Sequence, residues 1–194
     1  MILIGIDDEK LLLASSLLFS GAVFAADWTP AFRYLEAGKS GDDGAMLNEI
    51  MWSTFSKSFY KSLENKTNPP KQPLTKMALT GKFSTIKVPY RNDILPAKIE
   101  RTSDEYGHIT LIVTYPLKNA TLYGYPLESI TVIPTSCVDC DDLNRMYATF
   151  KPMSKTQFEQ LKQKVIFEDH PCDGEVANFY QAGRTVTLET RGGC

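Results

Sequence analysis

The feature that most constrains this chain is an uncharged, largely apolar run near its start, Leu11–Ala25. The run is shorter than the roughly 20 apolar residues that a helix needs to cross a bilayer. It ends in small residues, Val23 and Ala25, at the spacing that signal peptidase requires. This pattern predicts a signal peptide at residues 1–25, cleaved before Ala26, and hence a protein of the periplasm or one that is secreted. The alternative is a buried hydrophobic helix at the N-terminus.

The net charge of the chain argues against nucleic acid as a partner. The whole chain has a net charge of −2, and the predicted leader contains Asp7, Asp8 and Glu9 against a single Lys10. The acidic start is unusual for a leader, and a translation start nearer Lys10 accounts for it. Residues 26–194 are therefore close to neutral, which gives no electrostatic reason to expect binding to nucleic acid. The sequence also predicts no membrane anchor after cleavage.

Four cysteines lie in the C-terminal third of the chain: Cys137, Cys140, Cys172 and Cys194. An even number of cysteines in an exported chain predicts two disulfide bonds. Three connectivities are possible, and we expect the pairs Cys137–Cys140 and Cys172–Cys194.

Hydrophobic periodicity divides the mature chain into two parts. Residues 26–73 form a lead-in and an amphipathic helix over 45–65. Its apolar residues, Leu47 and Ile50 among them, recur at helical spacing. Residues 74–194 alternate between apolar and polar positions, which is typical of strands. Strands are expected around Ile86–Val88, 109–115, 122–125, 129–133 and 145–151. A helix that begins at Ser154 follows, with Phe158, Leu161 and Val165 as its buried positions. A closing hairpin over 176–190 is expected to turn at Ala182-Gly183, with Val186 and Leu188 pointing inward. The expected fold class is α+β: an N-terminal helix and then a β-rich, partly barrel-like domain with one inserted helix.

The C-terminal segment resembles a known group of proteins. Lys164-Val-Ile-Phe-Glu, then Cys172-x-Gly174, then Thr185-Val-Thr-Leu-Glu and a final Cys194 are similar to the second half of small exported bacterial OB-fold domains. The resemblance covers roughly residues 145–194, and Gln163 stands where that group has a glycine. It implies an OB-like barrel with the helix placed before the last two strands.

Cys137-Val-Asp-Cys140 is the one local motif that suggests a reaction. A C-x-x-C pair cycles between dithiol and disulfide when its first sulfur has a low pKa. Here the acidic neighbours Asp139, Asp141 and Asp142 disfavour a thiolate. A structural disulfide is therefore the main prediction, and a thiol-disulfide redox protein is the alternative. No cofactor, metal site or catalytic residue is expected, so the chain is not predicted to be an enzyme.

Two features suggest binding instead. Tyr123 and Tyr125 are two positions apart, so on one strand they would share a face and could stack on a sugar or a partner's side chain. The alternative is that these rings belong to the core. Asp139, Asp141 and Asp142 give the cysteine loop an acidic surface that is also a possible binding site.

These features favour a non-catalytic binding protein of the inhibitor or immunity type, whose partner is another protein. The segment from Ile130 to Cys140 is similar in outline to the disulfide-closed loop of one family of lysozyme inhibitors, although it is shorter and lacks that family's central histidine. A protein that binds a small ligand or carbohydrate is a further alternative.

Overall fold

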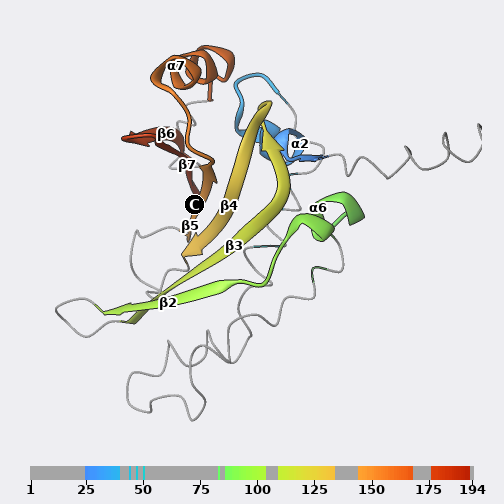
Figure 1. Ribbon diagram of the computed structural model, residues 1–194, viewed down its shortest axis with the longest axis vertical. Helices are drawn as coiled ribbons and strands as arrows, with labels where there is room; N and C mark the ends of the chain where they lie inside the picture. Colours follow the sequence, from blue (N-terminus) through green and yellow to red (C-terminus); the bar gives the residue numbers. More distant parts are fainter. Residues whose placement is uncertain are drawn as a thin grey trace, which may run out of the picture.

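A computed structural model describes residues 25–39, 44, 47, 50, 83, 86–103, 109–133, 144–167 and 176–192. The fold is α+β, as the sequence predicted, and is dominated by a seven-stranded sheet in the order β1-β3-β4-β5-β7-β6, with β2 also paired to β3 (Figure 1). The strands are β1 (Ala26–Asp27), β2 (Lys98–Ser103), β3 (Ile109–Leu122), β4 (Tyr125–Ile133), β5 (Asn144–Phe150), β6 (Val176–Ala182) and β7 (Thr185–Gly192). The helices are α2 (Thr29–Phe32), the 3-10 helix η1 (Arg33–Leu35), α6 (Val88–Asp93) and α7 (Lys155–Lys164).

All neighbouring strands pair in antiparallel fashion except β1, which runs parallel to β3. Both edges of β3 are occupied, one by β4 and the other by β2 and β1. Pro116 lies inside β3 beyond the last residue that pairs with β2, Thr114, so its missing N–H interrupts no bond of that ladder. Within the described residues the sheet is open, and the predicted barrel closure is not seen.

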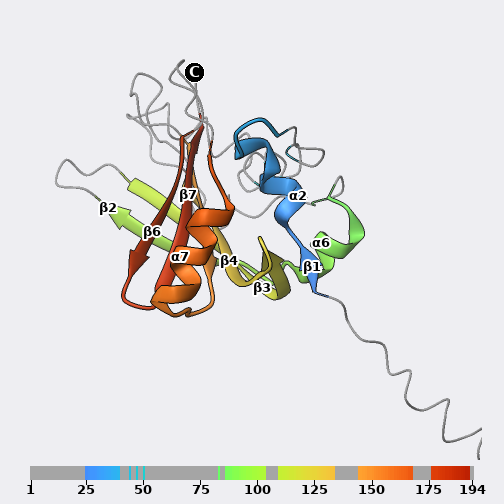
Figure 2. The same cartoon turned by 90° about the horizontal axis from the view of Figure 1, so that it is seen from above.

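One face of the sheet, called here the inner face, forms the core. Alternate residues of β3, β4, β5 and β7 are buried there, as period-two patterning requires. They pack against the segment from Trp28 to Leu35 and against α7, which contributes Phe158 and Leu161. In Figure 2, β1, α2 and α6 lie together on one side of the molecule, away from the β6–β7 hairpin.

The helix predicted to begin at Ser154 is confirmed. Ser154 Oγ accepts the backbone N–H of Gln157 at 3.2 Å, and Gln157 Oε1 accepts the N–H of Ser154 at 2.8 Å. This capping box satisfies two N–H groups that the first turn leaves without helical partners. The predicted buried residues of this helix, Phe158, Leu161 and Val165, are all buried.

The predicted helix over 45–65 lies almost wholly outside the described residues. Two of its predicted apolar positions, Leu47 and Ile50, are described; both are helical and about 1% exposed.

The strand predicted around Ile86–Val88 is wrong, because residues Val88–Asp93 form the short helix α6. Pro89 stands in its first turn, where a fixed φ and the missing N–H suit a helix. The closing hairpin is confirmed, with Val186 and Leu188 buried as predicted, but its turn lies at Gly183–Arg184, one residue later than expected.

Candidate functional site

The predicted tyrosine face does not form. Tyr123 lies in the turn between β3 and β4, so Tyr123 and Tyr125 are not on one strand. Tyr123 and Gly124 have φ values of 55° and 84°, and two successive positive values define a two-residue type I′ hairpin turn. The sequence-based expectation failed here because Tyr-Gly lacks the Asn or Asp that usually announces such a turn.

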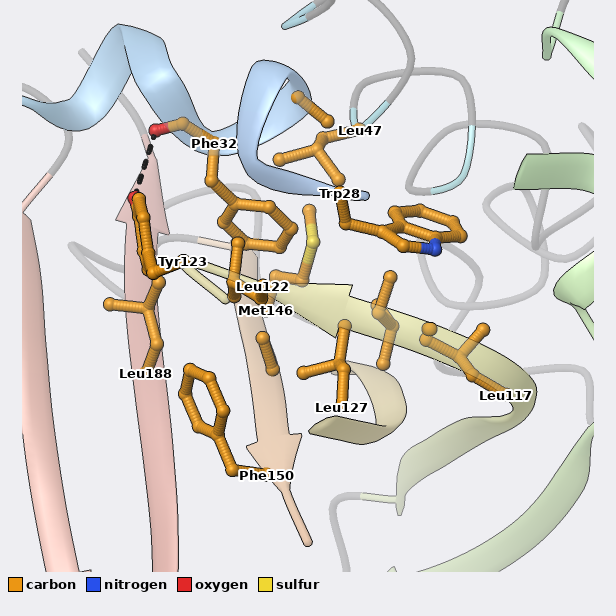
Figure 3. Packing of buried hydrophobic residues seen from close by; sticks show 14 of the residues in the cluster. Trp28, Phe32, Leu47, Leu117, Leu122, Tyr123, Leu127, Met146, Phe150 and Leu188 are labelled. Carbon is orange, nitrogen blue, oxygen red and sulfur yellow. Dashed lines mark hydrogen bonds between the residues drawn. The ribbon is translucent and has the colours of Figure 1, made fainter. Parts of the chain in front are cut away.

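The Tyr123 ring belongs to the core rather than to a binding surface. Its side chain is buried, and its hydroxyl donates to the backbone oxygen of Phe32 at 3.5 Å (Figure 3). Its backbone N–H donates to Thr29 Oγ1 at 2.7 Å, and its carbonyl accepts Lys164 Nζ at 2.8 Å. Burial, followed by the charge of Glu36, raises the pKa of Tyr123 far above its usual range. These contacts hold an unusual backbone conformation and tie α2 and α7 to the β3–β4 turn.

Other residues predicted to take part in disulfides or binding lie outside the described part of the chain. They are Cys137, Cys140, Cys172, Cys194, Asp139, Asp141 and Asp142. Tyr125 is half-buried and packs against the core cluster.

A cluster of polar side chains that the sequence did not reveal lies on the outer face of the sheet, opposite the core. Tyr147 of β5 and Glu189 of β7 are direct cross-strand partners, and Tyr147 Oη donates to Glu189 Oε1 at 3.1 Å. Arg191 lies two residues further along β7 and donates from Nε to the same oxygen at 2.8 Å. Glu189 is thus a carboxylate with two donors, and only 8% of its side chain is exposed.

The electrostatics of this cluster follow from those contacts. Burial acts to raise the pKa of Glu189, but hydrogen bonds from Arg191 and Tyr147 outweigh it, so the pKa is lowered. Tyr180 of β6 also contributes to the lowering. Burial and then the charge of Glu189 raise the pKa of Tyr147. At neutral pH the carboxyl group is therefore ionised and the phenol is neutral.

The surroundings of Glu189 are basic and aromatic. Arg145 is the cross-strand partner of Arg191, so a second basic residue lies on the same face of the sheet. Tyr180 is 50% exposed, and the Arg191 side chain is 45% exposed. We call this set of residues the β5–β7 patch: Arg145, Tyr147, Tyr180, Glu189 and Arg191.

The sequence predicts the face of β7 on which Glu189 lies, but not the residues of β5 that lie beside it. Alternation in β7 predicts that Val186 and Leu188 point inward, which places Glu189 on the other face. It does not give the register that brings Tyr147, which is 42 positions away, opposite Glu189.

The described residues contain no group of three or more His, Cys, Asp or Glu side chains that could hold a metal ion. Among the same residues, no helix has the length and apolar character needed to cross a membrane.

Comparison with known proteins gave no match: no family model matches the chain, and none was found among curated proteins or solved structures.

Proposed function

We propose that the chain is an exported, non-catalytic binding protein whose partner is another protein, and that the β5–β7 patch is its contact surface. The observation that carries this proposal is the ordered array around Glu189, in which one carboxylate fixes Tyr147 and Arg191 beside the exposed ring of Tyr180.

The residue types of the patch are those enriched in protein interfaces. Tyrosine and arginine dominate interface hot spots because they combine large contact area with hydrogen-bonding groups. Tyr147 and Arg191 are already held by Glu189, so little side-chain entropy remains to be lost on binding. Pre-ordering of this kind lowers the free-energy cost of forming a complex.

The charge of the patch indicates the chemistry of the partner. The Arg191 side chain is 45% exposed, whereas that of its ion-pair partner Glu189 is only 8% exposed, so the charge that this pair presents to solvent is positive. An exposed guanidinium group suits an acidic side chain on the partner.

The same electrostatics disfavour acid–base catalysis at this patch. A general acid or base works best with a pKa near the operating pH. Here the pKa of Glu189 is lowered and that of Tyr147 is raised, so both move away from neutrality. This supports a binding role over an enzymatic one.

The inhibitor or immunity type of binding protein remains the form of this proposal, with the leader over 1–25 directing export. A thiol-disulfide role for Cys137 and Cys140 is the alternative for the cysteine loop. A carbohydrate or small-ligand role would now depend on Tyr125 without Tyr123, because the Tyr123 ring is buried.

OB-like closure of the sheet is part of the same proposal. Its support is the position of α7 between β5 and the β6–β7 hairpin, as the resemblance implies. Amide-proton NOE contacts between β6 and the β2 edge are expected for a closed sheet. Their absence, with the contacts of the open path present, would reject closure.

Photo-crosslinking in the native host tests the binding role. A benzoylphenylalanine placed at Tyr180 is expected to capture a protein, whereas the same group at the exposed Glu159 of α7 serves as the matched control. With the captured partner purified, Arg191→Ala is expected to weaken binding at least about tenfold. Arg184→Ala, in the exposed turn of the same hairpin, is expected to leave the affinity unchanged. Equal capture at both positions, or equal affinity of the two variants, would reject the β5–β7 patch as the contact surface.

A further inference from the structure

The residue predicted to become the N-terminus of the mature protein is not loose. Ala26 is the first residue of β1, pairs with Ala120 of β3, and is only 7% exposed. The next residue but one, Trp28, is fully buried, and its N–H donates to the Thr121 oxygen at 2.7 Å. The first residues of a domain are usually poorly ordered unless they are tied down. Here Ala26 and Trp28 are both held in place by the sheet.

Trp28 anchors this segment against α6. Its ring meets the ring of Tyr90 edge-on, with 5.1 Å between the centroids. Asp27 reinforces the start of α2, since its Oδ1 accepts both the N–H and the hydroxyl of Thr29, at 3.0 and 2.6 Å. The position of the Ala26 nitrogen is therefore set by its neighbours on both the sheet and α6.

The Ala26 nitrogen faces a buried carboxylate. It donates to Oδ2 of Asp93, the last residue of α6, at 3.3 Å. Asp93 is 5% exposed. Burial raises its pKa, against the backbone N–H groups of Ala26 and Asn119 and the charge of Lys118. The nearby Trp28 indole N–H is not within hydrogen-bonding geometry of the carboxylate. Lys118 is itself exposed, and the carboxylate has no ion-pair partner among the described residues.

A single hydrolysis would supply that partner. A signal peptidase adds one water across the Ala25–Ala26 peptide bond, leaving a carboxylate on Ala25 and an α-amine on Ala26. A free α-amine has an ordinary pKa of about 7.7–8.0, so it takes a proton at neutral pH. The nitrogen that donates to Asp93 as a neutral amide then carries a positive charge.

We propose that processing between Ala25 and Ala26 creates a buried ion pair between the new α-ammonium group and Asp93, which locks the mature N-terminus onto α6. This inference rests on the export proposed above. Because Ala25 is exposed and Ala26 is buried, the bond has to be cut before β1 docks onto the sheet. Because of the ion pair, the folded mature domain is more stable than the same domain with its leader attached.

The first arm of the test asks whether the processing occurs. The full chain is expressed with export in a bacterial host, and the purified product is examined by intact mass and N-terminal sequencing. The expected product begins at Ala26. An uncut chain, or a product that begins elsewhere, overturns the processing and with it the ion pair.

The second arm asks whether the new amine and Asp93 are coupled. Unfolding is compared for the exported product and for the uncut chain made by membrane-free translation, each with Asp93 and with Asp93→Asn. In the exported product the substitution is expected to raise the unfolding equilibrium constant at least about tenfold, because it leaves a buried ammonium group without its counter-ion. In the uncut chain it is expected to have little effect. Glu189→Gln is the matched control and should act equally in both forms.

Reactivity of the amine provides a readout that does not depend on the uncut chain. The α-amine of the folded exported product should resist acylation at neutral pH, and Asp93→Asn should speed its modification at least about tenfold. A product that begins at Ala26 but shows neither the coupling nor the protection overturns the ion pair, while export remains supported.

Discussion

Asp93 and Glu189 are two carboxylates that are almost equally buried, at 5% and 6% exposure, yet their pKa values shift in opposite directions. Burial acts to raise both values. At Glu189 the guanidinium of Arg191 and the hydroxyl of Tyr147 reverse the effect, whereas at Asp93 the hydrogen-bond donors are neutral. Of the two acids, only Glu189 has a cation in contact with it among the described residues, and this difference accounts for the opposite shifts in pKa.

The two regions differ in where the partners of the carboxylate come from. In the β5–β7 patch the neighbouring strands provide the hydrogen-bond donors of Glu189, so these contacts are complete once the sheet has formed. The region where β1 meets α6 places a backbone nitrogen at the position where a cation is needed. We propose that Asp93 gains its counter-ion only when the chain is cut before Ala26.

The largest expected effect comes from breaking the anchor of the Asp93 region. Trp28→Ala empties a fully buried site and should lower the free energy of unfolding by about 3–5 kcal/mol. Urea unfolding of the exported product measures this. Ile166→Ala, at a position that is 69% exposed, is the control and should change stability by less than about 0.5 kcal/mol. Equal effects of the two substitutions would show that Trp28 does not hold β1 in place.

The next effect comes from removing the other carboxylate. Glu189→Ala leaves Tyr147 without its acceptor and Arg145 opposite an uncompensated Arg191, and should cost about 2–3 kcal/mol. The value lies below that of a fully buried pair because the Arg191 side chain is 45% exposed. A loss below about 0.5 kcal/mol in urea unfolding would contradict the role given to Glu189.

Acid should weaken the Glu189 region in a defined pH range. The pKa of Glu189 is lower in the folded state, so its contribution is fully present above its ordinary value of 4.5 and is lost as the pH falls through the folded value. A protonated Glu189 keeps its place, so the loss is smaller than that of Glu189→Ala. Stability measured against pH for the wild type and Glu189→Gln should converge in acid. Parallel curves would argue against the shift.

Tyr147→Phe tests one hydrogen bond of the patch. It removes the donor at 3.1 Å from Glu189 and keeps the ring, so a loss of about 1 kcal/mol is expected. The carboxyl pKa of Glu189 should also rise in this variant, which carbon-detected NMR can follow. A pKa that does not move would mean that Arg191 alone keeps Glu189 ionised.

The smallest effect is expected for Asp93→Asn in the uncut chain at neutral pH. There no described residue places a cation in contact with the buried carboxylate, and its pKa is raised, so stability is lost as the pH rises through the folded pKa. The neutral amide should therefore leave stability unchanged or increase it by up to about 1 kcal/mol. A clear loss would show that Asp93 already has a compensating charge before processing.

Local signals carried most of what the sequence predicted correctly. The capping box of Ser154 and Gln157 spans three residues, and the inward positions Val186 and Leu188 follow from strand alternation. The predictions that failed did so for one of two reasons. Either the local pattern was typical of a different element, or a contact with a residue far away in the sequence determined the conformation. Val88 looks like a strand residue until Pro89 is placed in the first turn of a helix, and Tyr123 adopts a positive φ through contacts with Thr29, Phe32 and Lys164.

Neither carboxylate site follows from local pattern. Tyr147 and Glu189 are 42 positions apart, and Ala26 and Asp93 are 67 apart. Sequence periodicity gives the face on which a residue lies, but not its neighbour on another strand. The contact between the predicted cleavage site and the buried Asp93 becomes evident only when the structure places β1 beside α6.

The most direct measurement is a carbon-detected NMR titration of the Asp93 and Glu189 carboxyl groups in the exported product and in the uncut chain. We expect the pKa of Glu189 to be lowered and equal in both forms, because its cation belongs to β7. The pKa of Asp93 is expected to lie above its ordinary value in the uncut chain and below it in the exported product. An Asp93 pKa that is the same in both forms would contradict the claim that processing supplies the missing charge.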